Sequence, residues 1–175
     1  MQVELVLTII ANDRPGVVET VAQSIVDHSG SWVDSALSRL GGSFAGIVKV
    51  SVDDKNAEGL EKALFGLSDN GIEISVRRGD TSTANTGAKA RLELLGQDHV
   101  GIVLQVTRLL AAQGVNVEEM ETSVFTASMS GERMFRAGAD IRLPADLSRD
   151  QLGIALENLA QDLMVEINLN DDSGA

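Results

Sequence analysis

The residues best suited to chemistry in this chain are two aspartates, Asp13 and Asp98, which each stand three residues before a glycine. Each aspartate follows an apolar run typical of a buried strand, and each glycine opens a run with the apolar spacing of a helix. Backbone N–H groups at a helix start form a site for a carboxylate, and a neighbouring aspartate can accept from an ammonium group. The two loops therefore predict sites for an α-amino acid, and the alternative is that both aspartates serve only as helix caps.

The candidate binding residues cluster in these two loops. They are Asn12, Asp13, Arg14 and Gly16 in the first loop, and Gln97, Asp98, His99 and Gly101 in the second. His99 is a possible ligand donor and equally a solvated loop residue. The other histidine, His28, lies near the end of the first helix, where the dipole favours a cation, and is predicted to be structural.

No residue set in the sequence predicts catalysis, a metal or a cofactor. Asp53-Asp54 and Asp171-Asp172 lack convergent partners and are expected in solvated loops. No serine–histidine–aspartate set and no phosphate-binding glycine loop can be assembled by motif. Gly41-Gly42 reads as a hairpin turn.

Charge and composition restrict the partners of the chain. Its 175 residues carry a formal net charge of −12 without any cysteine. Direct binding to nucleic acid is not expected, because such binding depends on Lys and Arg neutralising phosphates. No apolar run is long enough to span a membrane and no signal peptide is recognisable, so a cytoplasmic protein is expected.

The chain reads as a duplicated βαββαβ unit. A small, polar segment, Gly79–Gly87, separates the copies, which gives domains at residues 1–80 and 88–175 with 81–87 as the linker. The predicted strands are 3–11, 32–40, 44–52, 72–78, 88–95, 115–126, 134–143 and 164–169. The predicted helices follow Gly16 and Gly101, and two more are marked by the apolar spacing of residues 57–67 and of residues 152–163, the last capped near Ser148. Residues 170–175 are expected as a frayed tail. Such a unit closes most simply as an antiparallel four-stranded sheet with both helices on one face, the ferredoxin-like α+β arrangement.

The first copy resembles the ACT domain family, whose members are small modules that bind amino acids between copies. The resemblance rests on the order of a strand, an N-D-R-P-G loop, an apolar helix and a glycine at which the helix ends. Residues 113–117, Q-G-V-N-V, resemble the G-x-N-I element of the family's second strand. The resemblance implies that Asn116 reaches a ligand held by the loop of a facing copy. Aligning Gly30 with Gly114 places Trp32 where the second copy has Asn116, so the two sites are expected to differ.

A chain of two ACT domains without a catalytic partner resembles the glycine cleavage system transcriptional repressor family. The resemblance implies a non-catalytic sensor of glycine or a similar amino acid that acts through a DNA-binding transcriptional activator, and a homo-oligomer is compatible with it. An allosteric module for a metabolic enzyme is the main alternative. An enzyme using Asn12 and Arg14 is a weaker one, and the charge and scarce aromatics oppose an RNA-binding module.

Overall fold

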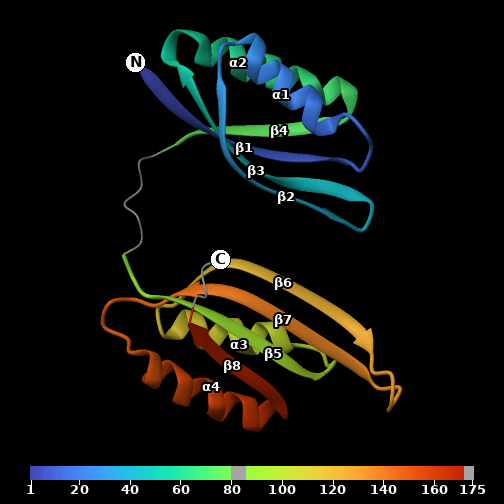
Figure 1. Cartoon of the computed structure of the whole chain (residues 1–175), viewed down its shortest axis with the longest axis vertical. Helices are drawn as coiled ribbons and strands as arrows, with labels where there is room; N and C mark the ends of the chain where they lie inside the picture. The colour runs from blue at the N-terminus through green and yellow to red at the C-terminus, as the bar shows by residue number, and fades with distance from the viewer. Residues whose placement is uncertain (80–85, 172–175) are drawn as a thin grey trace. The chain divides into compact units, whose positions relative to one another are not determined.

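The computed structural model describes residues 1–79 and 86–171, and the chain divides into two compact units, Met1–Thr83 and Ala84–Ala175. Each unit repeats the order βαββαβ (Figure 1). This confirms the predicted tandem ferredoxin-like α+β fold. Most of the segment expected as the linker, 81–87, lies outside the described residues. Gly87 is described, and its carbonyl accepts from Arg142 Nη1 at 3.0 Å.

Unit 1 is a four-stranded antiparallel sheet in the order β2-β3-β1-β4. Its elements are β1 (Gln2–Asn12), α1 (Val17–Asp27), β2 (Ser31–Leu40), β3 (Ser43–Asp53), α2 (Asp54–Gly66), a short 3-10 helix η1 (Leu67–Asn70) and β4 (Ile72–Arg78). The turn between β2 and β3 uses Gly41 at φ 59° and Gly42 at φ 82°. Both angles are left-handed, which confirms the hairpin predicted from the paired glycines.

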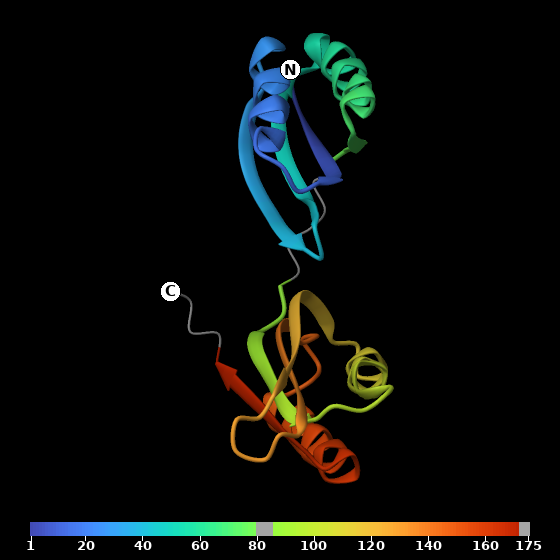
Figure 2. The ribbon, with the colours of Figure 1, turned by 90° about the vertical axis from the view of Figure 1, so that its right-hand side faces the viewer.

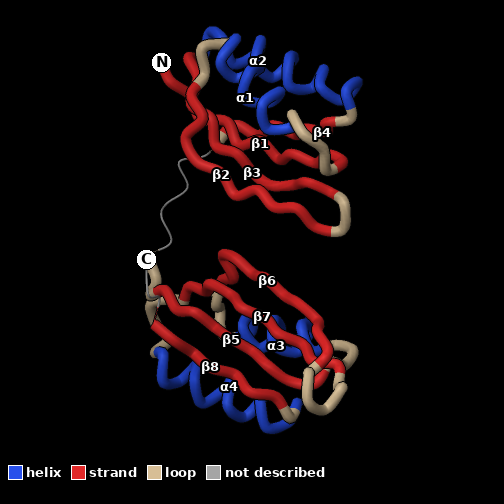
Figure 3. Tube along the Cα trace, turned by 45° about the vertical axis from the view of Figure 1, so that its right-hand side comes forward, coloured by secondary structure: helices blue, strands red, loops and turns tan. Residues whose placement is uncertain are grey.

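Unit 2 has the same topology, in the order β6-β7-β5-β8. Its elements are β5 (Lys89–Gln97), α3 (Ile102–Ala112), β6 (Asn116–Thr126), β7 (Arg133–Arg142), α4 (Arg149–Leu163) and β8 (Val165–Asp171). The β6–β7 connection is a longer loop than the Gly41-Gly42 turn (Figure 3). Because β8 runs to Asp171 and pairs with β5 there, the expectation that the tail frays from Asn170 was wrong.

In each unit both helices cover one face of the sheet (Figures 1 and 2). Alternate strand residues point at those helices, as Leu5, Leu7 and Ile9 do on β1 and Leu92 and Leu94 do on β5, and they are at most 2% exposed. The intervening residues form the other face, here called the open face. Each unit thus has its own apolar core, and its open face bears no helix from that unit.

Local capping explains where the second helix of each unit begins. Asp53 accepts from the amide of Lys55 at the start of α2. Ser148 caps α4 in a reciprocal capping box with Gln151, which confirms the start predicted near Ser148. The expectation that Asp53 and Asp54 lie in a solvated loop was therefore wrong, because both residues lie at the N-terminus of α2.

Candidate functional site

The two predicted loops share one backbone geometry. Gly16 has φ 91° and ψ −6°, and Gly101 has φ 91° and ψ 0°. A Cβ added to either glycine would meet nothing within 4 Å. The glycines are therefore required by the left-handed conformation and not by crowding. Each carbonyl then receives the first helical hydrogen bond, from the amide of Thr20 at 2.9 Å and of Gln105 at 3.0 Å.

The helices after these loops begin without a side-chain cap. No side chain accepts from the first-turn amides of α1 or α3 as a cap, whereas α2 and α4 are both capped by a side chain. The interpretation of Asp13 as a helix cap was wrong, because Gly16 occupies the N-cap position. The first-turn amides of α1 and α3 are the backbone donors that could bind a carboxylate.

Both loop aspartates are instead paired with an arginine of the neighbouring hairpin. Asp13 Oδ2 pairs with Arg39 Nε at the end of β2, and Asp98 Oδ2 lies 2.9 Å from Arg133 Nε at the start of β7. The amides of these aspartates also bond to the hairpin, to the carbonyls of Gly42 and Arg133. In both units the aspartate therefore anchors the loop to the hairpin through Oδ2, and Oδ1 has no partner among the described residues.

The remaining loop residues differ between the units. Arg14 Nη2 donates to the carbonyl of Asn70, so its guanidinium ties the loop to η1. This engagement disfavours the alternative in which Arg14 cradles an anion in an active site. His99, at the equivalent position, is half-buried with Nδ1 3.3 Å from the carbonyl of Val100. Asn12 and Gln97 are exposed and end β1 and β5.

Asn116 does not meet the second loop within its own unit. The register pairs Asn116 with Arg142 and Arg142 with Lys89, the first residue of β5, whereas the loop follows Gln97, the last residue of β5. At roughly 3.3 Å per residue, the ends of this strand are about 26 Å apart. A ligand could contact both Asn116 and the Asp98 loop only if they came from two copies of unit 2.

The expected correspondence of Trp32 with Asn116 was wrong by one residue. Both second strands carry a register shift, between Trp32 and Asp34 in unit 1 and between Val117 and Glu119 in unit 2. Trp32 therefore corresponds to Val117, and Ser31 corresponds to Asn116. The left-handed residue that ends the first helix is likewise Ser29 (φ 58°) in unit 1 and Gly114 (φ 70°) in unit 2. Both units thus place an exposed polar side chain at this position.

The neighbourhood of Asn116 is held by a strong ion pair. Arg142 Nε and Nη2 donate to the two carboxylate oxygens of Glu118, at 2.5 Å and 3.2 Å. This hydrogen bonding and the arginine charge hold the pKa of Glu118 below its ordinary value. The result is a fixed, charge-compensated edge around the first residues of β6.

Other predicted features have ordinary structural roles. His28 is the C-cap of α1, with Nδ1 2.8 Å from the carbonyl of Ser24, and its ring lies against Gly59 of α2. Its predicted structural role is confirmed. Across residues 1–79 and 86–171, no group of three or more His, Asp or Glu side chains could hold a metal ion. None of the helices in those ranges is long and apolar enough to cross a membrane.

Comparisons with known proteins agree with this geometry. A family model for the ACT domain matches residues 4–77. An unknown protein from Galdieria sulphuraria is 30% identical, with a TM-score of 0.82 over 97% of this chain and 98% of that one. A candidate glycine cleavage system transcriptional repressor is 20% identical, with a TM-score of 0.73 over 97% of each chain, and it shares the tandem fold. No curated protein matches the sequence.

Proposed function

Because unit 1 matches the ACT domain family model and unit 2 repeats its topology, we propose that this chain is a non-catalytic regulatory protein that binds a small amino acid at its repeated loops. The observation that carries the proposal is the shared loop geometry. Two helices that start after D-x-x-G lack side-chain caps, whereas the other two helices have them. A ligand carboxylate would complete the hydrogen bonding of those first turns.

The ligand ammonium group then has two acceptors. The free Oδ1 of Asp13 or Asp98 lies in the loop itself, and Asn116 or Ser31 would come from a facing unit. Glycine or a similarly small amino acid suits a site in which Val100 and Pro15 add apolar, non-hydrogen-bonding surface. In this proposal a facing unit of a second chain completes the site, as in a homo-oligomer.

The regulatory output proposed is repression of glycine cleavage through a DNA-binding activator in the cytoplasm. The shared tandem fold with a candidate repressor of that system supports this role. The net charge of −12 supports action through a protein partner, since the chain offers no excess of cations for phosphates. The main alternative is an ACT module that regulates a metabolic enzyme, and affinity capture separates the two by whether the partner is a DNA-binding regulator or an enzyme.

The binding step is tested by calorimetry with glycine and with L-serine. We expect saturable binding that Asn116→Ala weakens by about tenfold, because one hydrogen bond to a charged group is lost. Gly101→Val is a poor test, because the left-handed φ of 91° strains any L-residue there and folding would suffer with binding. Absence of binding at about 10 mM of either amino acid refutes amino-acid sensing at the loops.

A further inference from the structure

The open faces of the two sheets have diverged in a way that the shared fold does not require. Residues on the central strand of unit 1 that face away from the helices are Val6, Thr8 and Ile10, and the equivalent residues of unit 2 are Arg91, Glu93 and Leu95. The neighbouring strand carries Ala45 and Ile47 in unit 1 where unit 2 has Arg136 and Gly138. In unit 1 Lys49 and Arg77 flank Val6, but across β3, β1 and β4 the rows through Thr8 and Ile10 carry one charge, Glu73. The equivalent rows of unit 2 carry Glu93, Arg136 and Glu166. The fold alone therefore does not require these three charges.

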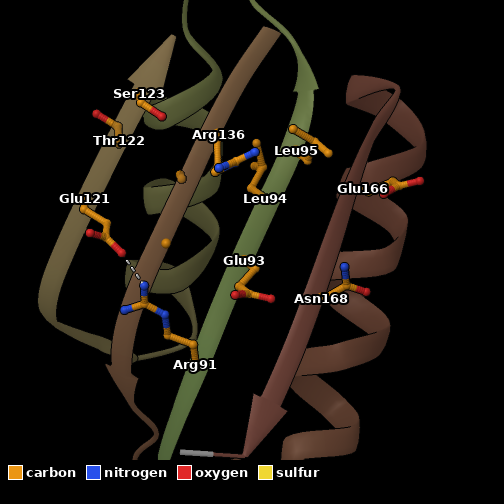
Figure 4. Close-up of a pocket in the computed structure, with 12 residues that line it drawn as sticks. Arg91, Glu93, Leu94, Leu95, Glu121, Thr122, Ser123, Arg136, Glu166 and Asn168 are labelled. Atoms are coloured by element: carbon orange, nitrogen blue, oxygen red, sulfur yellow. Dashed lines mark hydrogen bonds and ion pairs between the residues drawn. The ribbon is translucent and has the colours of Figure 1, made fainter. Parts of the chain in front are cut away.

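The charged face of unit 2 contains a groove of about 530 Å³ (Figure 4). This volume is within the range of small-molecule sites. Gly138 forms part of its floor, since a Cβ there would lie 2.4 Å from Arg91 Nη2. Arg91 lies over that glycine and is fixed by Asp140 at 2.9 Å and Glu121 at 2.6 Å. The floor is therefore built around a guanidinium whose charge is already compensated.

Three further charges of the groove are not paired with one another. Arg136 lies 5.0 Å from the centre of the Phe125 ring and makes no ion pair within the described part of the chain. Glu93 accepts from Asn170 Nδ2 through Oε2, at 3.1 Å, which leaves Oε1 available. Glu166 has no ion-pair partner among the described residues. These groups supply one positive and two negative charges around the groove.

The strand register arranges these charges around one apolar side chain. Leu95 pairs with Arg136 on β7 and with Glu166 on β8, so the three residues form one row across the sheet. The outer two are two strand spacings apart, about 10 Å between Cα atoms. Glu93 precedes Leu95 by two residues on the same face. Leu95 is 36% exposed and offers an apolar surface between the charges.

We propose that this groove binds an α-amino acid with a basic side chain, of the L-lysine or L-ornithine class. The ligand carboxylate pairs with Arg136, its α-ammonium with Glu93, and its methylene chain crosses Leu95 towards Glu166. One carboxylate and two ammonium groups complement the one cation and two anions of the groove. This site lies on the sheet face and is independent of the loop sites at the helix starts.

The test is calorimetry on the full chain with L-lysine, with L-norleucine as the matched ligand that lacks the terminal ammonium. We expect Arg136→Gln and Glu93→Gln each to weaken lysine binding by about tenfold or more, as expected for a lost charge-assisted contact. Norleucine should bind more weakly than lysine by a similar factor. Glu73→Gln is the control variant and should leave lysine binding unchanged. In unit 1 Glu73 pairs with Ile10, as Glu166 pairs with Leu95 in unit 2. The row of Glu73 has Ala45 in place of Arg136.

Amide chemical shifts identify where the lysine binds. Changes centred on Leu95 and Gly138 support the groove, whereas changes centred on Gly101 and Ile102 assign lysine to the loop and overturn the proposal. No binding of L-lysine at about 10 mM, or binding that Arg136→Gln leaves unchanged, also overturns it. Failure of the loop sites would show as absent glycine binding and leaves the lysine result unaffected.

Discussion

A reciprocal exchange at the ends of α1 and α3 tests whether the two units are correctly superposed. Ser29 is the left-handed residue after α1, at φ 58°, and Gly114 is the left-handed residue after α3, at φ 70°. Serine is strained in this conformation and glycine is not. We therefore expect Ser29→Gly to stabilise unit 1 and Gly114→Ser to destabilise unit 2.

The magnitude follows from two opposing terms. A left-handed conformation costs a non-glycine residue about 1–2 kcal/mol, and glycine raises the entropy of the unfolded chain by an amount worth about 0.4–1 kcal/mol. The difference is about 0.5–1 kcal/mol. Other contacts change little, since Ser29 is exposed and a Cβ on Gly114 would meet only Pro144 Cγ, at an ordinary 3.5 Å.

Thermal unfolding followed by circular dichroism measures the effect. For units of this size, the expected shift in Tm is about 2–8 °C, upward for Ser29→Gly and downward for Gly114→Ser. If the units unfold in separate transitions, each variant should move only one of them. A lower Tm for Ser29→Gly would refute the argument. Stabilisation by Gly30→Ser would also refute it. A Cβ added to Gly30 would lie 3.0 Å from Ile25 Cγ2, and Gly30 matches Gly114 only in the sequence alignment.

Three other outcomes are expected. Ser148→Ala should lower the free energy of unfolding by about 1 kcal/mol in urea titrations, because the capping box of α4 is lost. Arg142 lowers the pKa of Glu118 in the folded state, so this pair stabilises the folded protein above the unfolded pKa near 4.5. The stabilisation is lost as the pH falls through the folded pKa. Acid unfolding of the Glu118→Gln variant should lack this contribution. Gly46→Ala should destabilise unit 1 by more than about 2 kcal/mol, since its Cβ would lie 2.1 Å from a backbone carbonyl. Gly66→Ala on α2 meets open space and should stabilise unit 1 by roughly 0.5–1 kcal/mol. An equal effect of both variants in chemical denaturation would contradict this expectation.

The fold was predictable because its signals are local. Apolar runs marked β1 and β5, and paired glycines marked the β2–β3 turn, where both take positive φ. Ser148, a residue type favoured at helix caps, marked the start of α4. Each of these patterns involves neighbours within a few residues, so a single sequence contains all the information required.

The site was less predictable because its partners are distant in sequence. The pairing of Asp98 with Arg133 spans a hairpin and depends on the register of β5 with β7. Nothing near Asp98 in the sequence indicates that its Oδ2 is already occupied. The correspondence of Trp32 with Asn116 failed for a related reason. Two glycines, at 30 and 114, resembled one another, but serine fills the left-handed position in unit 1.

The placement of Asn116 has a consequence for regulation. Because Asn116 and the Asp98 loop lie at opposite ends of the same sheet, a ligand that contacts both must join two copies of unit 2. Binding free energy would then stabilise the contact between those units, and the contact would in turn raise ligand affinity by the same factor. Because the two copies of unit 2 belong to two chains, ligand affinity must rise with protein concentration. The groove of unit 2 lies on one sheet and has no such requirement. Lysine affinity should therefore be independent of protein concentration, and titrations at two concentrations distinguish an interfacial ligand site from one built within a single unit.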